Sequence, residues 1–202
     1  DSFFSNIDKY LNGNIDFSLI GSVYTEHTNY NPAGFFNNKD LKDAKFIDEF
    51  KLYEVDWIAG HTILVNLDKF SEKNIFDENF FLFFEELDLC KNVKDRNEKI
   101  FMSSTLKVNH LGWKSSFAAD KKFEIESIKL RNWHYLWSMF YYNKKNYGYI
   151  FALKKSLSRL FRSIIRIIYY SIKCDKKGMV TYTYRFLGLI NSILLKKSWY
   201  RP

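Results

Sequence analysis

The chain has 202 residues, of which 47% are hydrophobic and 19% aromatic. This composition excludes an intrinsically disordered chain, and the length allows one domain with a real core or one domain plus an appendage. The net charge of +8 divides unevenly into −7 over residues 1–126 and +15 over residues 127–202, which predicts an anionic partner for the C-terminal part, either a lipid surface or nucleic acid.

The first third of the chain alternates between helix and strand patterns. Residues 3–12 predict a short helix, and the apolar run FSLIGSVY at residues 17–24 predicts a strand. An Asn-rich loop is expected over residues 29–40. Residues 53–66 predict a further strand, in which Gly60 indicates a bend or a close approach of the backbone.

The middle of the chain continues the alternation. The elements expected next are a short helix opened by Asp68, a helix over residues 80–97, and short strands over residues 99–102 and 106–108. In the helix, Phe84, Leu87 and Val93 are expected to form the apolar side. Short strands that alternate with helices indicate an α/β fold.

The C-terminal part predicts a basic amphipathic helix, followed by a shorter similar stretch over residues 184–202. One side of the helix carries large apolar residues (Leu153, Leu157, Leu160, Ile164, Ile168, Ile172), and the other carries cations (Lys155, Arg159, Arg162, Arg166, Lys173). Lys or Arg interrupts every apolar run before the ~20 residues that a membrane span needs. Two interpretations stay open: association of residues 127–202 with a membrane surface, or a packing face whose cations are solvated.

Cysteine usage predicts a reducing compartment. The only cysteines, Cys90 and Cys174, are far apart and belong to no CxxC motif, which argues against a thiolate metal site. Both are expected to be packing residues.

A group of carboxylates stands in the Phe-rich stretch NIFDENFFLFFEELDLCKN, residues 74–92. Isolated buried charge costs several kcal/mol or more, so these side chains either face solvent or serve a function. On a helix Glu85 and Asp88 share a face, whereas Glu86 points about 100° away from Glu85. One turn could therefore present Glu86 to a cleft, and the alternative is a solvated acidic edge.

The order of several motifs resembles the second half of the family 2 glycosyltransferases, especially bacterial rhamnosyltransferase-like members that build surface polysaccharides. The motifs are VDWIAGHTILVN, FDENFFLFFEELDLC and VNHLGWKSS, from Val55 to Ser116, with a looser match further on. The resemblance implies a glycosyltransferase A (Rossmann-like) fold with the N-terminal nucleotide-binding half missing. Residues 1–126 would be the acceptor and catalytic part, expected to be inactive alone.

The resemblance also implies a mechanism and a site. An inverting transferase uses a carboxylate of the helix as the base that deprotonates the acceptor hydroxyl, and Glu86 falls where the family has an aspartate. Glu85 is predicted as a second catalytic residue and Asp88 as a substrate-binding residue. Both are expected to shape the helix and the neighbouring loop. Asn92 stands where the family commonly has an arginine.

Further site residues follow from the same resemblance. Asp56, Trp57 and Gly60 are expected to line the substrate cleft, with Trp57 otherwise a core residue. His110 and Asp1 are the expected ligands of a divalent metal, Mg²⁺ or Mn²⁺, that stabilises the leaving diphosphate. The alternatives for His110 are a contact with the phosphates or a structural role.

The resemblance predicts an enzyme that transfers a sugar from a nucleotide-sugar donor to a lipid-linked or other glycan acceptor. It would lie in the cytoplasm, peripheral on the anionic inner face of the bacterial membrane, with no nucleic-acid partner. The alternative is a noncatalytic basic module that binds membrane or nucleic acid.

Overall fold

The chain divides by packing into two compact units, which are described separately. The computed structural model describes residues 2–24, 33–37, 39–71, 75–109 and 123–201. The first unit comprises residues 1–77 and 85–110, and the second comprises residues 78–84 and 111–202. The change of charge at residue 126 falls inside helix α3 (Glu124–Tyr147).

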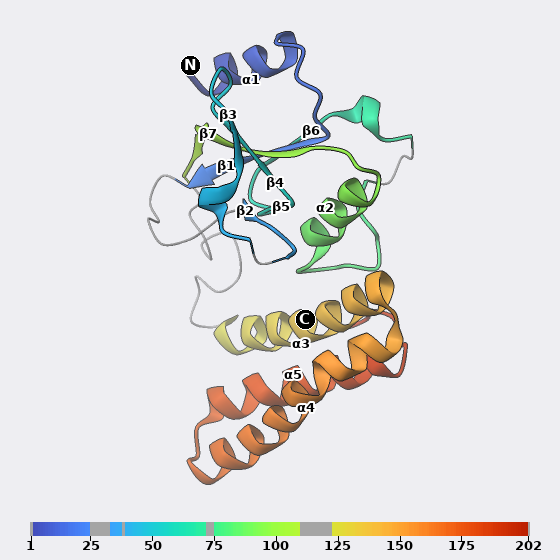
Figure 1. The fold of residues 1–202 in the computed structure, drawn as a ribbon. Coiled ribbons are helices and arrows are strands. Elements are labelled where there is room, and N and C mark those ends of the chain that lie inside the picture. The colour runs from blue at the N-terminus through green and yellow to red at the C-terminus, as the bar shows by residue number, and fades with distance from the viewer. Residues whose placement is uncertain (1, 25–32, 38, 72–74, 110–122, 202) are drawn as a thin grey trace. The chain divides into compact units, whose positions relative to one another are not determined.

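The first unit is built on a five-stranded sheet with the strand order β3-β4-β7-β1-β6 (Figure 1). These strands are β1 (Leu19–Tyr24), β3 (Lys45–Ile47), β4 (Leu52–Val55), β6 (Ile63–Val65) and β7 (Ile100–Val108). The β1 strand pairs parallel with β7 and antiparallel with β6, and β4 pairs antiparallel with β3 and β7. A two-stranded sheet joins β2 (Ala33–Gly34) to β5 (Trp57–Ile58). The mixed sheet with its helices confirms the α/β class.

Each face of the large sheet has its own apolar core, because successive residues of a strand point to opposite faces. Leu19 and Ile20 are both fully buried, yet they belong to different clusters. Helix α1 (Ser2–Asn12) brings Tyr10 to the Ile20 cluster. Helix α2 (Glu85–Asp95) packs on the Leu19 cluster, on the other side of the sheet (Figure 1). The helices α1 and α2 therefore cover opposite faces.

Two predicted strands divide differently in the structure. The strand expected over residues 53–66 is three strands, β4, β5 and β6, because the chain leaves the large sheet at Asp56 and β5 pairs with β2 instead. Conversely, the two strands expected over residues 99–102 and 106–108 are the single strand β7. Its pairing with β1 shifts register between Gly21 and Val23, and this irregularity replaces the expected break.

Short elements complete the first unit. The 3₁₀ turn η1 (Leu41–Asp43) and the strands β2 and β3 were not predicted from the sequence, whereas the 3₁₀ turn η2 (Leu67–Lys69) was. The expected short helix at Asp68 is η2, and its N-cap is Asn66, whose side chain accepts a hydrogen bond from the Asp68 N–H.

In the described part of the second unit the chain forms three helices: α3, α4 (Tyr149–Ile172) and α5 (Lys176–Ile193) (Figure 1). Each helix contacts the other two. Gly148 separates α3 from α4 with a φ of 89°, a conformation that favours glycine. Gly188 lets α5 approach α3, because a Cβ there would lie 2.1 Å from the Trp133 carbonyl oxygen. None of the described helices is long and apolar enough to cross a membrane.

Helix α4 does not bury the side that its sequence pattern suggests. Its buried residues are small: Ala152, Ser156 and Ser163. Of the predicted apolar side, Leu153 and Leu160 pack on the core of the second unit, whereas Leu157, Ile164, Ile168 and Ile172 are exposed. The interpretation of this side as a packing face therefore holds for Leu153 and Leu160 only, and the closest helix contacts are made by small residues instead.

Candidate functional site

The acidic helix begins later than its sequence pattern suggests. Residues 81–84 are not helical, because Phe83 and Phe84 have φ angles of 68° and 71°. Bulky residues rarely adopt this left-handed conformation, which costs about 1–3 kcal/mol per residue. Helix α2 therefore begins at Glu85, and Glu85 and Glu86 occupy its first turn.

The Phe residues before Glu85 belong to the packing of the second unit. Phe80 lies 5.0 Å from Tyr141 and Phe84 lies 5.6 Å from Tyr142 between ring centroids. The Ser138 hydroxyl donates a hydrogen bond of 2.8 Å to the Leu82 carbonyl oxygen. These aromatic and polar contacts stabilise the residues that adopt the unfavourable backbone conformation.

Glu86 and Gly60, two predicted site residues, lie side by side in the first unit. A Cβ atom placed on Gly60 would lie 3.3 Å from the Cβ of Glu86, 3.5 Å from its Cγ and 3.6 Å from its Cδ. The glutamate side chain therefore runs along the bare backbone of Gly60. The absence of a side chain at Gly60 was predicted to let a substrate approach the backbone. In the structure, the group closest to the position of that missing side chain is Glu86.

The environment of Glu86 raises the pKa of its carboxyl group. Burial raises the pKa of Glu86 above the ordinary value of 4.5, and the negative charge of Glu85 raises it further. The backbone N–H groups of Glu86 and Leu87, at the start of the helix, act in the opposite direction with a smaller effect. The carboxylate is thus half-buried rather than a solvated edge.

Glu85 shows the same tendency more simply. Burial raises the pKa of Glu85, and its own backbone N–H lowers it by less. Its Oε2 atom is buried, and within the described part of the chain no hydrogen bond reaches it. A buried carboxylate oxygen without a donor destabilises the charged form, so the two glutamates form an acidic pair with raised pKa values.

Asp56 connects three segments of the first unit. Its Oδ1 pairs with the Lys94 ammonium at 3.1 Å on α2, and its Oδ2 accepts a hydrogen bond of 3.2 Å from the Phe36 N–H. Both oxygens thus have protein partners. This arrangement makes Asp56 a positioning residue that ties the loop after β2 and the chain between β4 and β5 to α2.

Trp57 lies partly buried on the edge of the Leu19 core cluster. It pairs with Gly34 across the small sheet, and a Cβ on Gly34 would lie 2.9 Å from the indole ring. One part of the indole therefore packs on backbone, as expected of a core tryptophan.

The buried side of α2 consists of Asp88, Leu89, Cys90 and Val93. Phe84 and Leu87 were also predicted for this side, but the helix begins after Phe84, and Leu87 is only half-buried. Asn92 Nδ2 donates a long hydrogen bond of 3.5 Å to Oδ2 of Asp88, a predicted substrate-binding residue.

The two cysteines differ in environment. Cys90 is buried, and burial raises the pKa of its thiol to about 12, with backbone contact to Ile58 acting against this and the charge of Glu86 adding to it. Cys90 is a packing residue, as predicted. Cys174 is exposed beyond the end of α4, so the same prediction is wrong for it.

Sequence reasoning missed one polar pair near Gly60. His61 follows Gly60 directly, and its Nε2 lies 3.0 Å from the hydroxyl of Ser22, which is buried in β1. Ser22 stands on a predicted strand and His61 beside a predicted bend. Their contact depends on the pairing of β1 with β6, which the sequence alone does not give.

The predicted metal residues, His110 and Asp1, lie outside the described residues. Among the residues that are described, no group of three or more His, Cys, Asp or Glu side chains could hold a metal ion. Glu85, Glu86 and Asp88 therefore do not form a metal centre by themselves, and the divalent cation stays a prediction that depends on the other two positions.

Comparison with protein-family models, with curated proteins and with solved structures found no match to this chain. The functional interpretation consequently depends on the motifs of the sequence and on the geometry of α2 and its neighbours.

Proposed function

We propose that this chain is the acceptor and catalytic part of an inverting family 2 glycosyltransferase with a glycosyltransferase A type fold. The single observation that carries the proposal is the placement of the Glu86 side chain along Gly60, at the first turn of α2, with a raised pKa. The motifs that contribute these residues, WIAGH and FFEELDLC, resemble the family in the same order. The mixed α/β sheet of the first unit is compatible with that fold.

In this proposal Glu86 is the general base. The ionised carboxylate takes the proton of the acceptor hydroxyl as that oxygen forms a bond to the anomeric carbon of the donor sugar. The bond from the anomeric carbon to the diphosphate breaks, and the nucleoside diphosphate leaves with the electron pair. A carboxylate with a raised pKa holds a proton more strongly than an exposed one, and this increases the driving force of the transfer.

The geometry also addresses the replacement of the family aspartate by glutamate. Glutamate has one more methylene, and catalytic geometry is sensitive at about the ångström level. Because Gly60 has no side chain, the longer Glu86 side chain can lie flat against the backbone. Glu85 acts through its charge on Glu86, and the Asp56–Lys94 pair holds α2 against the preceding strands.

The donor is a nucleotide sugar, and the acceptor is a lipid-linked or cell-surface glycan. These assignments follow from the family resemblance. The predicted cation on His110 and Asp1 would neutralise charge on the diphosphate.

The test is Glu86→Gln in the longest natural protein that contains these 202 residues, with release of nucleoside diphosphate from a panel of nucleotide sugars as the readout. Removing a general base lowers turnover by about 10²–10⁴-fold, and the amide keeps the shape of the side chain. The control is Glu49→Gln, an exposed glutamate of the same unit, which is expected to leave turnover unchanged. Equal turnover in wild type and Glu86→Gln would remove Glu86 from the mechanism and with it the proposal.

A further inference from the structure

Large apolar side chains cover the solvent side of α4. At 100° per residue, Ile150, Leu157, Phe161, Ile164, Ile165, Ile168 and Ile172 fall within a sector about 100° wide. Their exposed fractions run from 40% for Ile164 to 78% for Ile172. These seven residues are called the outer apolar face. It is distinct from the packed side of α4, which buries Ala152, Ser156 and Ser163.

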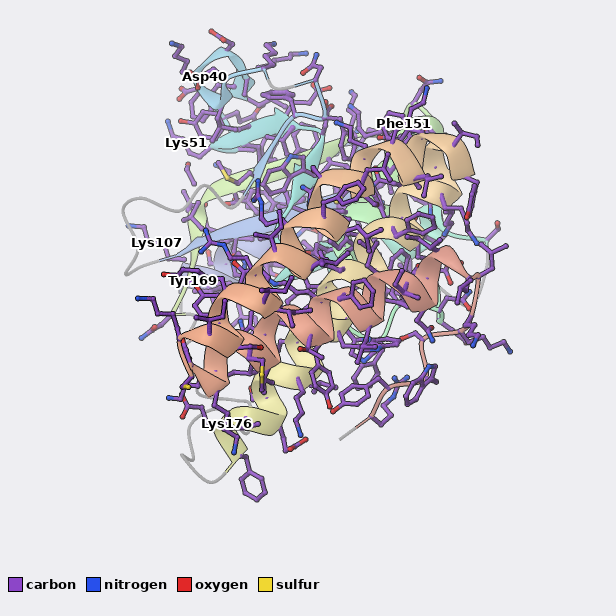
Figure 2. The ribbon with its side chains drawn as sticks, turned by 90° about the horizontal axis from the view of Figure 1, so that it is seen from below. Asp40, Lys51, Lys107, Phe151, Tyr169 and Lys176 are labelled. Atoms are coloured by element: carbon purple, nitrogen blue, oxygen red, sulfur yellow. The ribbon has the colours of Figure 1, made fainter. Side chains whose placement is uncertain are left out.

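Cations occupy the remaining exposed side of the helix. Lys154 lies within the apolar sector, and Lys155, Arg159, Arg162 and Arg166 are exposed on the side between the outer apolar face and the packed side. Helix α4 contains no acidic residue. In Figure 2, α4 runs from Phe151, near its start, to Tyr169, near its end, alongside α5.

We propose that the outer apolar face of α4 docks in the plane of an anionic lipid bilayer, with the aliphatic side chains in the acyl boundary and the arginines on the lipid phosphates. An interfacial helix has these features: a broad apolar sector, a polar face rich in Lys and Arg, and no run long enough to span. Long basic side chains can also reach the headgroups while their methylene stems lie in the apolar layer.

Charge and side-chain chemistry favour lipid over the other occupants. A second copy of this chain would bring a second Lys154 to the face and a second row of cations beside it, and like charges oppose such a contact. Single-stranded nucleic acid binds on aromatic platforms, whereas six of the seven residues of the face are aliphatic. A bilayer requires no matching shape, only apolar depth and negative charge, and both needs are met along all of α4.

The proposal does not depend on the transferase activity, because α4 contributes no residue to the Glu86 site. If α4 docks on lipid, it would keep an enzyme with a lipid-linked acceptor at the surface where that acceptor lies. Either proposal can fail while the other stands.

Vesicle sedimentation of the full chain tests the docking. The vesicles contain equal parts of phosphatidylcholine and phosphatidylglycerol, or phosphatidylcholine alone. Wild type is expected to sediment with the anionic vesicles and to bind less as salt rises. The double variant Phe161→Glu/Ile165→Glu replaces two exposed residues of the face, 60% and 65% exposed, and is expected to bind at least about 100-fold more weakly. Leu11→Glu, a residue of α1 that is 60% exposed, is the matched control and is expected to bind as wild type.

A charge variant and a fluorescent probe test the docking on lipid without relying on the double glutamate variant. Arg159→Gln/Arg162→Gln/Arg166→Gln keeps the apolar face and is expected to bind about 100-fold more weakly, since each cation near the surface contributes a factor of about five. An environment-sensitive fluorophore on the exposed Cys174 is expected to shift to the blue with anionic vesicles only, and the buried Cys90 does not compete for the label.

Three results would overturn the proposal. In the first, wild type does not bind anionic vesicles. In the second, wild type binds both kinds of vesicle equally. In the third, the double glutamate variant binds as tightly as Leu11→Glu. A dimer in light scattering that the double variant dissolves would assign the face to a second copy, and retention of RNA without vesicle binding would assign it to nucleic acid. Glu86→Gln is expected to bind vesicles as wild type does, so loss of activity and loss of docking are read separately.

Discussion

Helices α2 and α4 both have amphipathic sequences, but they use their apolar residues in opposite ways. Helix α2 buries Leu89, Cys90 and Val93 against the sheet. Helix α4 buries Ala152, Ser156 and Ser163 and leaves larger residues such as Ile165 exposed. Hydrophobic periodicity therefore identifies the faces of a helix, but it does not say which face is packed within the chain and which is left for a partner.

The two units also differ in their buried titratable groups. In the second unit, burial lowers the pKa of His134 to about 4; the charge of Arg201 lowers it further, and a hydrogen bond to the Tyr200 carbonyl acts against this. In the first unit, burial raises the pKa values of Glu85 and Glu86. Acid should therefore weaken one unit through its histidine and strengthen the other through its glutamates.

The largest expected effect separates the two helices directly. Leu89→Ala in α2 removes a side chain that is 2% exposed and is expected to lower the free energy of unfolding by about 2–5 kcal/mol. Ile165→Ala in α4 removes a side chain that is 65% exposed and is expected to change it by less than about 0.5 kcal/mol. Urea titration of both variants measures the difference. A large loss for Ile165→Ala would show that its face is packed in solution, and the contrast between the helices would disappear.

The next effect concerns the histidine. The folded pKa of about 4 lies below the ordinary value of 6.5, so the unfolded chain binds more protons between these values and stability is lost as pH falls through this range. The loss is on the order of 3 kcal/mol, complete below the folded pKa and absent above pH 6.5. His134→Gln removes the titration and is expected to flatten this part of the pH profile. An equally steep profile in the variant would assign the acid sensitivity to another group.

The role of His134 explains why that dependence belongs to the second unit. Its Nε2 lies 2.9 Å from the Tyr200 carbonyl oxygen and its Nδ1 lies 3.2 Å from the Ser198 hydroxyl. The Trp137 indole N–H donates to the Lys196 carbonyl oxygen at 3.1 Å. The segment after α5 is thus held on α3, and a proton on the imidazole would place a charge in this buried site.

Local patterns in the sequence predicted what depends on local interactions. Helix α1 and strand β1 form where the patterns place them, because helix periodicity and a short apolar run suffice to define them. The break at Asp56 and the continuity of β7 were not predictable, because each depends on which distant strand supplies the hydrogen bonds. The same limit applies to α4, whose packed face is decided by the neighbouring helices.

The candidate site was predictable to a similar degree. The motif resemblance selected Glu86 and Gly60, and the structure places them in contact. It did not select His61, which meets Ser22 only through strand pairing. The start of α2 was also hidden, because no propensity predicts two consecutive phenylalanines in the left-handed region.

The smallest expected effect tests the acidic pair and the sign of the pH dependence in the first unit. The folded pKa of Glu85 is raised, so the folded chain binds more protons than the unfolded chain above pH 4.5, and rising pH destabilises this unit through Glu85. Glu85→Gln removes the buried charge and is expected to stabilise the chain by about 1 kcal/mol at neutral pH, with no gain below the unfolded pKa. Urea titrations at neutral and acidic pH measure this, with Glu49→Gln as the exposed control. Because Glu85 raises the pKa of Glu86, the same variant should move the acid limb of any turnover profile to lower pH. If the variant gains stability but the acid limb of its turnover profile does not move, Glu85 has no effect on the proposed base. Its role would then be limited to the start of the helix.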